Sequence, residues 1–167
     1  MTLDQWALVA QIVSAIAVIA SLIFVGFQLN KATSAIRATS SQAHSSLYTD
    51  LVQSIIDNAD FARSWSIGLT NPQALPEEEW VRFVAYASAL FRLYESSRVQ
   101  WLNGRLDEEH WHTIERQATD FGHLPGLQLA WKLRGHWYST EFHEWFDNLK
   151  PAEEPQPYAR DGRDRGP

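Results

Sequence analysis

Two short clusters of histidine and carboxylate residues are the first candidates for chemistry in this 167-residue chain. Glu109 and His112 lie three residues apart, and Glu141-Phe-His-Glu144 sets a histidine beside two carboxylates. On a helix this spacing can present both side chains to one metal ion, but helical di-iron sites need two Glu-x-x-His pairs and two further carboxylates. The chain has one such pair, so we expect no metal site and no cofactor. A helical metalloenzyme is the least favoured interpretation.

Other catalytic signatures are missing from the sequence. There is no cysteine, no Gly-x-Ser-x-Gly elbow for a nucleophilic serine, and no glycine-rich loop that would cradle a phosphate. The net charge of −6 argues against nucleic acid as a partner, because phosphate binding needs a basic surface. We therefore predict no catalytic residue and a non-enzymatic function.

Arg92, Tyr94 and Glu95 form a third candidate group, beside the apolar Leu90 and Phe91. An arginine and a glutamate three residues apart on a helix can form an ion pair. One interpretation is a polar network that fixes the packing of the helices. The other is that the three residues line a small-ligand pocket or a groove for a partner protein.

The element with the clearest signal is an apolar segment near the N-terminus, from Trp6 to Phe27. At about 1.5 Å per residue it covers about 30 Å, the thickness of the hydrocarbon core of a bilayer. Its mean hydropathy is roughly +2, whereas that of the whole chain is −0.30. A cleaved signal peptide is the alternative, but its charged N-terminal region would be basic, and here it contains Asp4. We predict a retained transmembrane helix.

The charges beside this helix predict its orientation. Asp4 precedes it, and Lys31 and Arg37 follow it. Because basic residues stay on the cytoplasmic side, the N-terminus is expected outside and the C-terminal domain in the cytoplasm.

One face of the predicted membrane helix carries small residues. They recur three and four positions apart and form what we call the small-residue face: Ala7, Ala10, Ser14, Ala17 and Ser21, extended by Gln28. Helices associate in lipid through close backbone approach and hydrogen bonds, which such a face allows. Gln11, an amide inside the apolar segment, would also favour a partner over lipid. Ordinary membrane-helix composition is the plainer explanation; the sharper one is self-association or docking on another membrane helix.

The rest of the chain has helical periodicity and no segment with strand alternation. We predict an all-α protein with a transmembrane helix over residues 1–30, a helical stalk over 31–46, a bundle of five to six helices over 47–150, and a disordered tail over 151–167. The chain has eight tryptophans, most of them at spacings typical of a helical core.

Caps mark several helix boundaries within the predicted bundle. Pro76 followed by three glutamates predicts a helix start, and Asn103-Gly104 its end. Asp107 and Ser139 predict the N-caps of two later helices. Gly68 is predicted to stop a short helix.

Several segments together resemble a family of short bacterial membrane proteins with one N-terminal membrane helix and a tryptophan-rich helical domain. They are Leu75-Pro-Glu-Glu-Glu-Trp-Val-Arg-Phe83, Phe91-Arg-Leu-Tyr-Glu95, Gln100, Asn103-Gly-Arg-Leu-Asp107, Trp111, Ala130-Trp131 and Phe142. The resemblance implies a bacterial inner membrane location and no particular activity or site residue.

The predicted function is a membrane-anchored interaction or accessory subunit. Its partners would be the bilayer and either further copies of the chain or a larger membrane complex. The alternative is a membrane-anchored sensor or effector that binds a small ligand in its helical domain.

Overall fold

The structure, a computed structural model, describes residues 2–151, and every regular element in that range is a helix. The α-helices are α1 (Leu3–Ile56), α2 (Ala59–Thr70), α3 (Glu77–Leu102), α4 (Glu108–Gly122), α5 (Pro125–Arg134) and α6 (Thr140–Asp147), joined in part by the 3₁₀ turns η1 (Pro72–Ala74) and η2 (Gly135–Trp137). The all-α prediction is confirmed, with six α-helices and no strand over residues 2–151. Apart from Pro151, the predicted disordered tail lies outside the described residues.

The chain divides into two units, which we call the apolar unit (described from residue 2 to 39) and the bundle unit (described from 40 to 151). Helix α1 contributes to both, and the bundle unit begins at Ser40 rather than at residue 47. His44 explains the earlier start, because its side chain is buried within the bundle unit. The segment from Ser40 to Ser46 therefore belongs to the bundle, although we predicted it as stalk.

In the apolar unit, the described side chains are exposed. Within residues 2–151, α1 is the helix that is long and apolar enough to cross a membrane. It continues without interruption past the apolar segment, as the absence of proline and glycine between Gln28 and Ile67 led us to expect.

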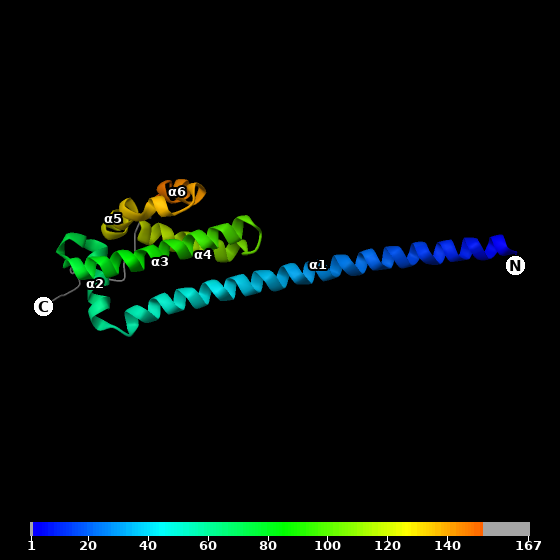
Figure 1. Ribbon diagram of the computed structural model, residues 1–167, viewed down its shortest axis with the longest axis horizontal. Helices are drawn as coiled ribbons and strands as arrows, with labels where there is room; N and C mark the ends of the chain where they lie inside the picture. The colour runs from blue at the N-terminus through cyan, green and yellow to red at the C-terminus, as the bar shows by residue number, and fades with distance from the viewer. Residues whose placement is uncertain (1, 152–167) are drawn as a thin grey trace. The chain divides into compact units, whose positions relative to one another are not determined.

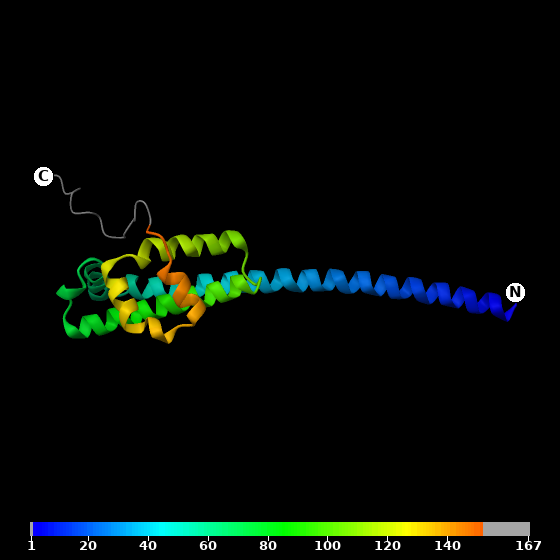
Figure 2. The same cartoon turned by 90° about the horizontal axis from the view of Figure 1, so that it is seen from above.

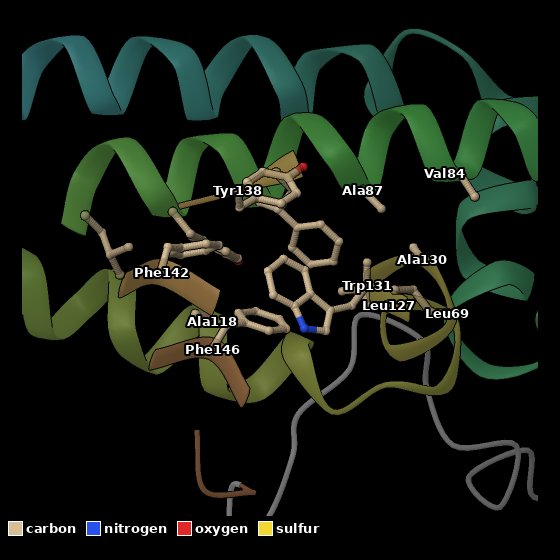
Figure 3. Packing of buried hydrophobic residues seen from close by; sticks show 14 of the residues in the cluster. Leu69, Val84, Ala87, Ala118, Leu127, Ala130, Trp131, Tyr138, Phe142 and Phe146 are labelled. Carbon is tan, nitrogen blue, oxygen red and sulfur yellow. The ribbon is translucent and has the colours of Figure 1, made fainter. Parts of the chain in front are cut away.

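In the bundle unit, α3 and α4 lie side by side in Figure 1 and in Figure 2. Helices α2 and α5 pack against α3, and α5 also contacts α4. Aromatic side chains fill the core: Phe91 and Phe146 lie with their ring centroids 5.1 Å and 4.5 Å from that of Trp131. Figure 3 shows Trp131 and Phe146 together with Phe142 and Tyr138. Tryptophan-rich packing is thus the basis of the bundle.

The predicted helix starts are confirmed by their caps. The carboxylate of Asp107 accepts a hydrogen bond of 2.8 Å from the backbone N–H of His110, and the Ser139 hydroxyl accepts one from Phe142. Helix α3 begins directly after Pro76, with three glutamates in its first turn. These carboxylates stabilise the helix because they lie at the positive end of its dipole.

The predicted stop at Gly68 is wrong, because α2 continues to Thr70. Gly68 is instead a packing residue. A Cβ atom on it would overlap the ring of Phe83, and a Cβ on Gly126 would overlap the carbonyl oxygen of Gly68. The two glycines let α2 and α5 approach closely. In a sequence, a glycine needed for such packing cannot be distinguished from a glycine that ends a helix.

Candidate functional site

The small-residue face lies on the apolar unit, and Ala7, Ala10, Ser14, Ala17 and Ser21 are exposed, as are Gln11 and Gln28. The Ser21 hydroxyl donates a hydrogen bond of 2.8 Å to the carbonyl oxygen of Ala17, one turn back. Its donor is therefore satisfied within the helix, and its oxygen remains able to accept a hydrogen bond from another helix. The geometry permits close helix approach at this face.

Arg92 and Glu95 come together on α3, where the guanidinium and the carboxylate form an ion pair. The second carboxylate oxygen of Glu95 accepts a hydrogen bond of 2.7 Å from the backbone N–H of Ser139, the N-cap of α6. Arg92 also lies over the ring of Tyr138, 4.6 Å from its centroid. Glu95 is only 8% exposed, so this network joins α3 to the start of α6 inside the bundle.

Tyr94 does not share this location. Its buried side chain lines a small cavity of about 20 Å³, together with residues of α1, α2 and α4. The three residues that we grouped by sequence therefore do not form one pocket: Arg92 and Glu95 contact the segment before α6, and Tyr94 faces the other way. Successive side chains on a helix are about 100° apart, so residues 92 and 94 point in nearly opposite directions.

The histidine and carboxylate clusters are paired locally. His112 lies 3.3 Å from Glu115 and 3.7 Å from Glu108, and the Nδ1 of His143 lies 3.0 Å from Asp147. Over residues 2–151 there is no group of three or more histidine, aspartate or glutamate side chains arranged to hold a metal ion. The contacts made by His112 are those of a solvated helix face.

A buried histidine that the sequence did not single out, His44, attaches the last part of α1 to α3. Its Nδ1 lies 2.6 Å from the Ser97 hydroxyl, which itself donates to the carbonyl oxygen of Leu93. Because the one hydroxyl proton of Ser97 is used in that bond, His44 must donate, and its neutral ring carries the proton on Nδ1. Burial, with a smaller effect of His110 nearby, lowers the pKa of His44 to about 4. His44 is thus a neutral anchor at neutral pH.

Arg98 is a second residue that sequence analysis missed. Its guanidinium lies 4.9 Å from the ring centroid of Trp145 and 5.6 Å from that of Trp111, and it forms an ion pair of 2.6 Å with Glu141. The only sequence signal was a basic residue beside the aromatic positions of α3. Arg98 holds α3, α4 and α6 together by cation–π contacts.

Beside Arg98, a surface groove of about 790 Å³ runs between α4 and α6. Its lining includes side chains of both charges: Arg98, Arg116 and Lys150, and Glu115, Asp120, Glu141 and Glu144. Opposite charges so close together partly neutralise one another. The groove therefore favours neither an anion nor a cation by charge alone.

Comparison with known proteins identifies no relative: no family model, no curated protein and no solved structure matches the chain. The resemblance to short bacterial membrane proteins stays a prediction.

Proposed function

We propose that this chain is a membrane-anchored, non-enzymatic interaction or accessory subunit. The observation that carries this proposal is the exposure of large apolar side chains along the first part of α1: Ile12, Ile16 and Phe24 are 57%, 61% and 62% exposed. Such a surface is unfavourable in water, because moving apolar area out of water lowers the free energy. A bilayer or a partner must cover this helix.

The proposed membrane is the bacterial inner membrane, with the N-terminus outside and the bundle unit in the cytoplasm. Lys31 and Arg37 on one side and Asp4 on the other support this orientation. A reporter active only in the cytoplasm, fused to the C-terminus, is expected to be active. Activity of the same reporter only when it is fused to the N-terminus would reverse the orientation.

Membrane anchoring is tested by fractionation. After expression in a bacterium, the chain should remain with the membranes through an alkaline wash, which strips peripheral proteins. Recovery in the washed supernatant would contradict the proposal.

Association is expected to depend on the small-residue face. Replacing Ser14 and Ala17 together by leucine adds bulk where a partner helix must approach, so crosslinked oligomers or a co-purified complex should be lost. The matched control replaces Ile12 and Ile19 by phenylalanine, which adds bulk on the opposite face of the same helix. Equal behaviour of the two double variants would contradict association through this face.

The second candidate function is a sensor or effector that binds a small ligand. Arg92 and Glu95 are engaged within the bundle, so they give this candidate little support.

A further inference from the structure

The end of α5 and the turn η2 that follows it present apolar and basic side chains together on the surface of the bundle unit. Leu133 and Trp137 are 44% and 52% exposed, Lys132 is exposed, and Arg134 is partly exposed. These four residues come from one short stretch of the chain and therefore share one small area of surface. We call them the basic-aromatic patch.

The exposed indole of Trp137 is held in position by two arginines. The guanidinium of Arg134 lies 4.3 Å from the centroid of the Trp137 ring, a cation–π contact. Arg92 of α3 donates a long hydrogen bond of 3.4 Å to the backbone carbonyl oxygen of Trp137. Because the patch is already ordered, binding to it costs less conformational entropy than binding to a mobile segment.

The positive charges of the patch are not neutralised by the chain itself. Between Asp120 and Glu141 the sequence contains no acidic residue. Over residues 2–151, neither Lys132 nor Arg134 forms an ion pair with a carboxylate, whereas Arg98 is paired with Glu141. The two cations therefore remain available to an anionic partner.

Two kinds of anionic partner fit such a surface, an acidic protein segment and an anionic phospholipid bilayer. Both would match Lys132 and Arg134 in charge. A bilayer also accounts for Leu133 and Trp137, because indole rings are favoured at the level of the lipid headgroups, where their apolar body leaves water. The proposed membrane anchor also keeps lipid at a high local concentration around the bundle unit, which makes a weak surface contact effective. The lipid surface is the favoured partner.

The acidic character of the chain, with a net charge of −6, opposes attraction of the whole bundle unit to anionic lipid. Salt limits this repulsion, because the Debye length is about 8 Å at physiological ionic strength. Only charges close to the bilayer then contribute strongly. An orientation that turns the basic-aromatic patch to the lipid is favoured over orientations that turn acidic residues to it.

We propose that the basic-aromatic patch docks the bundle unit on an anionic phospholipid surface. Lys132 and Arg134 lie against lipid phosphate groups, and Leu133 and Trp137 lie among the headgroups. The docking rests on the proposed membrane anchoring, since two cations and two apolar side chains bind lipid only weakly without a tether.

The test measures how close Trp137 comes to lipid headgroups. The full chain, labelled with ¹⁹F on its tryptophans, is placed in nanodiscs of phosphatidylcholine alone or of equal parts phosphatidylcholine and anionic phosphatidylglycerol. Each contains a trace of lipid with gadolinium on its headgroup, which broadens the NMR signals of nearby nuclei. The signals of Trp137 and Trp6 are identified by their loss in Trp137→Phe and Trp6→Phe. Trp137 should be broadened in the anionic nanodiscs and much less in phosphatidylcholine alone, and added salt should reverse the broadening.

Trp6 separates this proposal from the proposed anchoring. It precedes the apolar segment, so it should be broadened in both lipid mixtures and at every salt concentration if α1 spans the bilayer. A chain in which Trp6 is broadened and Trp137 is not would retain the anchor and overturn the docking. A chain in which neither is broadened would contradict both.

Matched variants make the outcome specific to the patch. Lys132→Gln with Arg134→Gln should lower the ratio of docked to undocked bundle about 25-fold, roughly fivefold for each charge. Arg105→Gln with Arg116→Gln removes the same charge from two exposed positions elsewhere and should leave the ratio nearly unchanged. The signal of the buried Trp111 reports whether each variant keeps its fold.

Equal broadening of Trp137 in the two lipid mixtures would show that anionic lipid is not recognised and would overturn the proposal. Equal effects of the two double variants would do the same, because they would show that total charge, and not the patch, decides docking.

Discussion

The apolar unit and the bundle unit contain the same kinds of large apolar residues in opposite surroundings. Phe24 and Phe27 are 62% and 66% exposed, whereas Phe83, Phe91 and Phe142 are fully buried. The bundle covers its aromatic residues with its own helices, but the apolar unit has one helix and nothing of its own to cover it. The difference teaches that hydrophobicity alone does not make a core: the bundle unit has other helices that cover its apolar side chains, whereas the described part of the apolar unit leaves them exposed.

The largest difference between the two units is expected when one glycine in each is replaced by alanine. Gly126→Ala places a Cβ against the backbone of Gly68 and 2.9 Å from the ring of Phe83, so it should destabilise the bundle by about 3 kcal/mol. Gly26→Ala meets no atom within 4 Å and should change stability by less than about 1 kcal/mol. Denaturation followed by near-ultraviolet circular dichroism measures both. Similar changes in the free energy of unfolding in the two variants would contradict the proposed difference between the two units.

The next effect is a loss of bundle stability in acid, caused by His44. Its folded-state pKa of about 4 lies below the ordinary value of 6.5, so the unfolded chain binds the extra proton first. The stabilisation is complete above pH 6.5 and is lost as the pH falls towards 4, by at most about 3 kcal/mol. The neutral ring donates a hydrogen bond to Ser97, and burial, with a smaller effect of His110 nearby, disfavours a positive charge on His44.

Urea denaturation between pH 4 and pH 7 measures this loss. His44→Gln should flatten the profile over that interval, whereas His136→Gln, at an exposed position, should leave it as steep as in the unsubstituted chain. A profile that is unchanged in His44→Gln would assign the acid sensitivity to other groups.

A smaller effect is expected in the network between α3 and α6. Glu95→Gln weakens the acceptor for the Ser139 N–H and removes the ion pair, which should destabilise the bundle by about 1–3 kcal/mol. Arg92→Ala should cost about 1 kcal/mol or less, because its side chain is 57% exposed. Thermal unfolding of both variants shows which substitution destabilises the bundle more. A larger loss in Arg92→Ala would show that the arginine, and not the buried carboxylate, holds the segment before α6.

The smallest effect on stability is expected in the apolar unit. The double substitution of Ser14 and Ala17 by leucine should leave bundle unfolding within about 0.5 kcal/mol of the unsubstituted chain, since these side chains are exposed. The proposed loss of association would then occur without a loss of fold. A drop in bundle stability in this variant would show that the two units are coupled energetically.

Much of the fold could be predicted from local chemistry. Asp107 and Ser139 satisfy helix N–H groups a few residues away, and the glutamates after Pro76 act on the helix that they begin, so all three starts were readable from sequence. Gly68 was misread because its role depends on Gly126, on a distant helix. The candidate site was predicted less well: Arg92 and Glu95 do meet, but Tyr94, between them in sequence, lies elsewhere.

The sequence by itself determined the helical class, most helix starts and an apolar segment long enough to cross a membrane, because caps, proline and hydropathy act within a few residues of the chain. Only the tertiary structure decided that His44 is a neutral anchor, that Arg98 joins three helices and that the indole N–H of Trp65 is buried without a partner among the described residues. These properties depend on burial and on partners from distant helices. Burial and the positions of partners are set when the helices pack, and no local pattern contains them.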